Sequence, residues 1–302
     1  MASTGAGQAS AAGPSQTDAT AASTTVGEVV IKGHKKPPES YSRAVSGFVA
    51  SHSQPSPIGT LSRWLSPVCP AVVGLTPRYT ELVSTRIKEV AAAMGAPHTG
   101  GCRHDNVRVV FTTEPQRLMD YVREKLPDIL GYHFLPQEMS LATFHGPIDA
   151  WHKTGTQGEN GGMHADDPYN QGDPTVASGG AYMDGGSNAS RLKGVVASRF
   201  LFALVVVDSG KVSKRSIGSV ADQIAMLVLT SPKRPKVCSP LPSLQDSLDP
   251  ACPASASLVT FSPYDEAFLK ALYSSDPQEK LALEQGAIAR RVEKSASPGA
   301  AN

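Results

Sequence analysis

Two histidines and two aspartates stand near one another in the middle of this chain. His152 precedes a stretch rich in Gly and Asn, and His164, Asp166 and Asp167 follow the first part of that stretch. If the chain turns back there as a hairpin, His152 and His164 could face each other with Asp166 beside them. Imidazole and carboxylate groups bind divalent metal ions. The cluster is therefore a candidate metal site, and the alternative is a polar ribbon in water.

The four cysteines fall into two well-separated groups. Neither a CxxC motif nor a Cys/His spacing typical of zinc sites is present. The even number and the grouping favour the disulfides Cys69–Cys102 and Cys238–Cys252, and with them an oxidising compartment, periplasmic or secreted. The alternative is four reduced, partly buried thiols. If the cysteines are paired, the chain has no thiol nucleophile.

Other standard catalytic signatures are missing from the sequence. There is no GxSxG elbow, no P-loop and no GxGxxG motif opening a helix, so we expect no cofactor. Trp151 lies among residues of a predicted edge strand. Because extended peptides bind by adding a strand to a sheet edge, Trp151 is a candidate for lining a peptide groove. The alternative is a half-buried amphipathic side chain.

The composition excludes two classes of partner. Only 18% of the 302 residues are charged and the net charge is +1, so we expect neither nucleic acid nor an anionic membrane as a partner. The longest apolar runs, such as Phe200 to Val207, are far too short to span a bilayer. The start of the chain, rich in Ala, Ser, Thr and Gly, lacks the pattern of a secretory signal. Residues 1–40 are predicted to be disordered.

The remaining pattern predicts one α+β domain over residues 41–294, with a mixed sheet packed on helices. The expected helices cover residues 41–51, 76–94, 114–126, 219–229, 262–273 and 280–292. The expected strands cover residues 106–112, 139–144, 148–154 and 200–208. Residues 155–190 are predicted to form a long flexible loop, which allows a hairpin through residues 157–162. Residues 295–302 are predicted to be a disordered tail.

The predicted helix from Ser219 to Leu229 follows the strongest strand, as the HExxH helix of zinc peptidases does. In that motif two histidines one turn apart bind the metal and a glutamate acts as general base. Here the histidine positions hold Asp222 and Met226, and the glutamate position holds Gln223. Asp222 is explained by a place in the first helical turn, and Met226 by core packing. The helix therefore lacks the groups that activate water.

Several segments resemble a group of uncharacterised exported bacterial proteins, over residues 26–292. They are Arg63–Pro70, Gly101–Asn106, Ala150–Thr154, Ser219–Met226, Leu241–Leu244 and Thr260–Tyr273. The C-terminal third is also similar to a broader bacterial family of unknown function with a zincin-like arrangement. Within it, Ser262–Tyr273 resembles the helix that closes metzincin domains.

These resemblances imply a degenerate zincin-like domain without its metal site. We therefore expect a non-catalytic envelope or periplasmic protein that acts by binding a protein or peptide partner, or as a structural component. The competing expectation is a metal-dependent hydrolase that uses His152, His164 and Asp166.

Overall fold

The computed structural model describes residues 39–158, 162–166, 194–232, 238–249 and 251–296. Most of the predicted N-terminal segment 1–40 and of the predicted tail 295–302 therefore lie outside the described residues. Most of the predicted loop 155–190 lies outside them as well. In the described part of the chain, no helix is long and apolar enough to cross a membrane.

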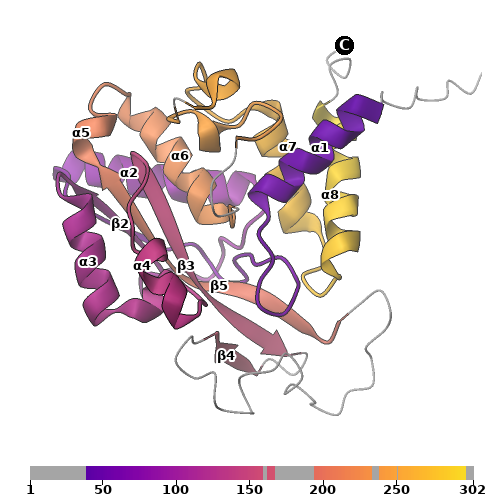
Figure 1. Cartoon of the computed structure of the whole chain (residues 1–302), viewed down its shortest axis with the longest axis horizontal. Helices are drawn as coiled ribbons and strands as arrows, with labels where there is room; N and C mark the ends of the chain where they lie inside the picture. The colour runs from indigo at the N-terminus through magenta and orange to yellow at the C-terminus, as the bar shows by residue number, and fades with distance from the viewer. Residues whose placement is uncertain (1–38, 159–161, 167–193, 233–237, 250, 297–302) are drawn as a thin grey trace, which may run out of the picture. The chain divides into compact units, whose positions relative to one another are not determined.

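The centre of the fold is one open mixed sheet of five strands in the order β1-β2-β5-β3-β4. The strands are β1 (Pro70–Val73), β2 (Val107–Thr112), β3 (Ile148–Gly158), β4 (Met163–Ala165) and β5 (Val196–Asp208). The pairs β1–β2 and β2–β5 are parallel, and β3 pairs antiparallel with both β5 and β4. The predicted α+β class with a mixed sheet is therefore confirmed. Figure 1 shows β3 and β5 as the two long strands.

Successive side chains of a strand point to opposite faces of the sheet, and apolar side chains are buried on both faces. Helices therefore pack on both faces. The α-helices are α1 (Glu39–His52), α2 (Pro77–Ala93), α3 (Pro115–Lys125), α4 (Glu138–Leu141), α5 (Ser209–Val212), α6 (Ile217–Leu229), α7 (Pro263–Ser274) and α8 (Leu281–Ala296). The larger core joins one face of the sheet to α1, α2, α6, α7 and α8. The smaller core joins Leu204, Val206 and Trp151, on the opposite face, to residues of α3.

Local signals account for several helix ends. Pro77 occupies the first turn of α2, and Gly95, just beyond its end, has φ +88°. Ser262 and Asp265 form the predicted capping box of α7. For α6 the predicted start is wrong, because the hydroxyl of Ser216, not Ser219, accepts the capping bond.

Two further differences concern the predicted strands and the loop. Residues 139–144, predicted as a strand, hold the end of α4 followed by irregular chain. The predicted loop 155–190 begins with residues 155–158 of β3, and β4 returns beside them. The hairpin suggested by the Gly-rich stretch is thus present, and it lengthens the sheet by one short edge strand.

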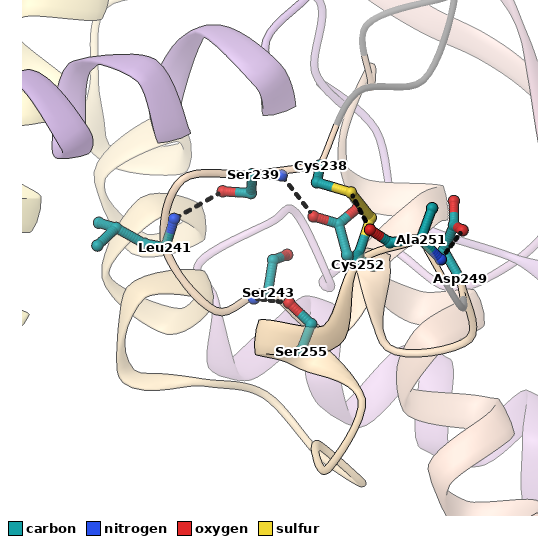
Figure 2. Close-up of a disulfide and its surroundings, with 9 residues drawn as sticks. Cys238, Ser239, Leu241, Ser243, Asp249, Ala251, Cys252 and Ser255 are labelled. Atoms are coloured by element: carbon teal, nitrogen blue, oxygen red, sulfur yellow. Dashed lines mark hydrogen bonds between the residues drawn. A yellow bond between two sulfur atoms is a disulfide. The ribbon is translucent and has the colours of Figure 1, made fainter.

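Both predicted disulfides are present. Cys69 and Cys102 lie 5.6 Å apart between Cα atoms, and Cys238 and Cys252 lie 5.4 Å apart. The second bridge closes the loop between Cys238 and Cys252. Within this loop the backbone amide of Ser243 donates to the hydroxyl of Ser255, which lies just beyond it, at 3.1 Å (Figure 2). That loop also contains a short 3-10 helix, η4 (Leu244–Asp246), whose Leu244 is fully buried.

Candidate functional site

The middle of α6, where a zinc peptidase would carry its metal ligands, is filled with protein. Met226 is fully buried in the larger core, and Asp222 and Gln223 each expose only 4% of their surface. All residues of α6 from Ser219 to Leu229 are buried. A substrate therefore has no access to this part of the helix.

Asp222 links α6 to two other segments. Its carboxylate accepts a hydrogen bond from the Arg86 guanidinium of α2 and another, at 2.8 Å, from the Thr260 hydroxyl. This ion pair raises the pKa of Arg86, mainly through the hydrogen bond to Asp222. Asp222 lies in the second turn of α6, not the first, so the explanation based on the helix start is replaced by this ion pair.

A pocket opens instead at the carboxyl end of α6. Its volume is about 240 Å³, and it is formed by segments far apart in the sequence. The residues after α6 contribute Ser231 and Pro232, and β3 contributes Ala150, Trp151, His152 and Thr154. The other lining residues come from the segment after α1, from Leu130 at the end of the 3-10 helix η1 (Pro127–Leu130) and the two residues after it, and from Leu141.

One wall of the pocket depends on a glycine. Gly131 has φ +84°, and a Cβ atom there would lie 2.5 Å from the carbonyl oxygen of His152. Only glycine tolerates both this backbone conformation and this close approach. The Gly131 backbone can therefore lie directly against β3, and the next residue, Tyr132, lines the pocket.

The pocket combines rigid apolar walls with a few hydroxyl groups. Pro55, Pro57 and Pro232 contribute rings whose backbone φ angles are fixed. The hydroxyls of Tyr132 and Ser231 form no hydrogen bond with any described residue. Of the fifteen described residues that line the pocket, none is Asp, Glu, Lys or Arg. This arrangement suits an uncharged ligand group, because a buried charge would lack a partner.

The structure separates the two histidines of the predicted metal cluster. His164 is paired with Thr156 across the β3–β4 hairpin, whereas His152 is paired with Ala203 of β5. Four residues of strand, about 13 Å, separate His152 from Thr156. The His152 ring packs 4.5 Å from the Phe200 ring, and its Nε2 lies 3.3 Å from the Val228 carbonyl oxygen.

Asp166 is held by two threonines of β3. The hydroxyls of Thr154 and Thr156 both donate to its carboxylate. Burial raises the pKa of Asp166, and these two hydrogen bonds partly oppose that rise. Among the described residues, no three His, Cys, Asp or Glu side chains are grouped so that they could hold a metal ion.

Trp151 is a core residue, not a half-buried groove residue. It exposes 2% of its surface, and its indole N–H donates to the Leu141 carbonyl oxygen at 2.8 Å. The ring belongs to the smaller core with Leu204 and Val206. Trp151 also lines the pocket, but almost all of its surface is buried.

Sequence reasoning missed a hydrogen-bonded chain of serine, histidine and aspartate. His52 Nε2 lies 2.7 Å from the Ser243 hydroxyl, which donates to Asp265 at 2.7 Å. In nucleophilic triads the histidine stands in the middle and takes the serine proton. Here the serine stands in the middle, and its hydroxyl donates a hydrogen bond to the carboxylate. All three residues are fully buried, so these two hydrogen bonds have a structural role and connect α1, the disulfide loop and α7.

No signal in the sequence marks these hydrogen-bonded residues, because His52 and Ser243 are 191 residues apart and Ser243 and Asp265 are 22 residues apart. The pocket could be found from the sequence only in part, through Trp151 and His152. Comparisons with protein-family models, curated proteins and solved structures found no match for this chain.

Proposed function

We propose that this chain is a non-catalytic periplasmic or secreted binding protein, on a scaffold related to zinc peptidases that lacks their metal ligands. Its ligand is a peptide or protein segment held at the carboxyl end of α6. The observation that carries the proposal is the pocket of about 240 Å³ beside Tyr132, His152 and Ser231, combined with the filled middle of the same helix.

Two disulfides support the compartment. Disulfides persist in oxidising surroundings and are rare in the cytosol, where thiols are kept reduced. This chain contains four cysteines, and all of them are paired. A compartment outside the cytoplasm also fits the resemblance to exported bacterial proteins.

The lining of the pocket supports binding. Hydrolysis of a peptide requires a nucleophile or an activated water beside a general base. Ser231 lines the pocket, and its hydroxyl forms no hydrogen bond with another described residue. This hydroxyl is therefore the candidate nucleophile for attack on a peptide bond. The imidazole in the described lining, that of His152, has its Nε2 3.3 Å from the Val228 carbonyl oxygen. The described lining therefore offers contact surface and hydrogen-bonding groups.

A selection experiment tests the proposal. Random heptapeptides displayed on phage are selected against the full chain with its disulfides intact. The enriched peptides are then synthesised and titrated into the wild type and into Ser231→Arg, which fills the pocket with a long side chain. Ser46→Arg, at an exposed position of α1, is the matched control.

The expected result is binding to the wild type and to Ser46→Arg, and a loss of at least tenfold in Ser231→Arg. If the enriched peptides bind all three proteins equally, they bind elsewhere and the proposed site is wrong. Failure to enrich any peptide would also count against the proposal. Circular dichroism of each variant shows that the fold is kept.

A further inference from the structure

The hydrogen bonds that join His52, Ser243 and Asp265 need one hydrogen more than these side chains carry as neutral imidazole, hydroxyl and carboxylate. We name these three residues the buried trio, because each has 0% of its surface exposed. His52 Nε2 lies 2.7 Å from the Ser243 oxygen, and the same oxygen lies 2.7 Å from Asp265 Oδ1. At such distances a hydrogen lies between the two atoms of each pair, since otherwise buried lone pairs would face each other.

The opposite side of the His52 ring fixes the number of hydrogens. Its Nδ1 lies 2.8 Å from the Phe48 carbonyl oxygen, which can only accept, so Nδ1 carries a hydrogen. The Ser51 hydroxyl, 3.0 Å from Nδ1, donates to the same carbonyl oxygen. A neutral imidazole has one hydrogen, so Nε2 of a neutral His52 offers only a lone pair. The single hydroxyl hydrogen of Ser243 must then serve two contacts.

An ionised Asp265 does not supply the missing hydrogen. Its Oδ2 accepts from the backbone amides of Leu244 and Ser262, at 2.9 Å and 2.8 Å, and a carboxylate has no hydrogen to donate. One additional proton completes the trio in either of two ways. On Nε2 it gives an imidazolium, and on Oδ1 it gives a neutral acid that donates to Ser243. The proton therefore belongs to the three residues together.

Other ionisable groups on the elements around the trio have interactions of their own. Glu266 of α7 and Glu284 of α8 each pair with a basic side chain. Asp246 of η4 accepts from a backbone amide at 2.7 Å, and the Tyr264 ring of α7 lies 6.1 Å from the Phe48 ring. Burial raises the pKa of Glu284, so this carboxyl group also makes stability depend on pH. A test of the trio must therefore compare proteins that all keep Glu284.

The trio adjoins the pocket through the end of α1. Two residues after His52, the amide of Gln54 donates to the Ser231 carbonyl oxygen at 2.7 Å. Gln54 and Ser231 both line the pocket, and so does Pro55. His52 fixes the end of α1 to the disulfide loop, so a change at the trio acts on a pocket wall two residues away.

We propose that the buried trio binds one proton more tightly than a free imidazole does, and that this proton keeps the pocket wall in place. The folded protein then retains the proton above about pH 6.5, where the unfolded chain loses it from His52. The stabilisation is complete below that pH and is lost as pH rises through the value at which the folded trio releases the proton. The effect on the pocket rests on the proposed function, whereas the proton itself does not.

NMR of the full chain locates the proton directly. At about pH 7.5, one unit above the ordinary imidazole value, the ¹⁵N shifts of the His52 ring distinguish an imidazolium from a neutral ring. The ¹³C shift of the Asp265 carboxyl group distinguishes the acid from the carboxylate. We expect either an imidazolium at His52 or a protonated Asp265. A neutral His52 beside an ionised Asp265 would overturn the proposal.

The variant Asp265→Asn supplies the hydrogen without the proton. Its amide oxygen can accept from the Leu244 and Ser262 amides while its NH₂ group donates to Ser243, as the protonated acid does. In urea titrations between about pH 6.5 and 9, the wild-type folding equilibrium constant should fall relative to that of Asp265→Asn. The fall should be about tenfold per pH unit until the trio releases its proton.

The matched control is Glu266→Gln, a change at the neighbouring position of α7, which should keep the wild-type slope. Glu284 is present in all three proteins, so its titration cancels. Parallel stability curves of wild type and Asp265→Asn would contradict the proposal. If Asp265→Asn does not fold, the NMR measurement on the wild type still decides.

The link to the pocket is tested with the peptides enriched by phage selection. Their dissociation constants are measured at about pH 6 and pH 9 in wild type and Asp265→Asn. With rising pH, affinity should fall about fivefold or more in wild type relative to the variant, as for two coupled sites. Equal changes in both proteins would refute the link. If selection yields no ligand, the proposed function fails, and the NMR and urea measurements still decide whether the trio holds its proton.

Discussion

The middle of α6 and its carboxyl end have opposite surroundings. Around Met226 the helix is enclosed by the larger core, and Asp222 is occupied by Arg86 and Thr260. Just beyond Leu229 the chain lines a pocket with Ser231 and Pro232. The middle of α6 is therefore part of the core, while a recess near its carboxyl end is accessible. Resemblance to an enzyme at one stretch of helix therefore does not locate the functional surface.

The severest test of this contrast introduces the two histidines and the glutamate of an HExxH motif into α6. The variant Asp222→His, Gln223→Glu, Met226→His puts an imidazole in place of the fully buried Met226 side chain and a carboxylate in place of the buried Gln223 amide. It also removes the buried carboxylate that pairs with Arg86. We expect the free energy of unfolding to fall by more than about 4 kcal/mol in urea titrations. A variant that kept the wild-type midpoint and bound one zinc ion would show that the middle of α6 is still a metal site.

A milder change measures the packing alone. Met226→Ala leaves a cavity in the larger core, and the free energy of unfolding should fall by about 2–4 kcal/mol. Met139→Ala, at a position that is 64% exposed, should change it by less than about 0.5 kcal/mol. Similar losses in the two variants would mean that the middle of α6 is no better packed than the surface.

The wall of the pocket can be tested with two glycines. Gly131 and Gly101 both have positive φ angles, +84° and +70°, but only a Cβ at Gly131 would clash with β3. Gly131→Ala should therefore destabilise the protein by about 1–2 kcal/mol more than Gly101→Ala. Thermal unfolding of both variants measures the difference. Equal losses would show that β3 yields, and that the wall is softer than the geometry implies.

The smallest expected effect concerns Asp166, beside the pocket residue Thr154. Burial raises the pKa of Asp166 in the folded protein. The folded state therefore holds a proton at pH values where the unfolded state has lost it, and the free energy of unfolding falls as pH rises through the folded pKa. Asp166→Asn should remove this loss, about 1 kcal/mol or less between about pH 3 and pH 7.

Urea titrations across that pH range, in wild type and variant, give the comparison. If the two stability curves run parallel, Asp166 does not titrate as its burial requires. If wild type gains stability relative to the variant as pH rises, the sign of the pKa shift is wrong.

Features that depend on neighbouring residues could be predicted from the sequence. Pro77 at a helix start, the capping box of Ser262 and Asp265, and the alternation along β2 are local signals. The predicted capping residue of α6 was wrong by three positions because Ser216 and Ser219 both suit a cap, and only the tertiary fold decides between them. Residues 139–144 lack a clear period, so their apolar residues suggested a strand.

The candidate site was less predictable because its parts come from distant segments. Asp222 and Arg86 are 136 residues apart, and the pocket is assembled from the chain after α1, η1, β3 and the end of α6. The position of β5 between β2 and β3 sets that assembly. No local pattern in a single sequence specifies such a strand order.

The packing of α1 on α8 has a consequence for biosynthesis. The Tyr41 hydroxyl donates to the Ala296 carbonyl oxygen, 255 residues away, and the buried side chain of Arg63 donates to Glu284. While the ribosome is still adding α8, the Tyr41 hydroxyl lacks the Ala296 carbonyl and Arg63 lacks the carboxylate of Glu284. The contacts between α1, Arg63 and α8 can therefore form only after α8 has left the ribosome.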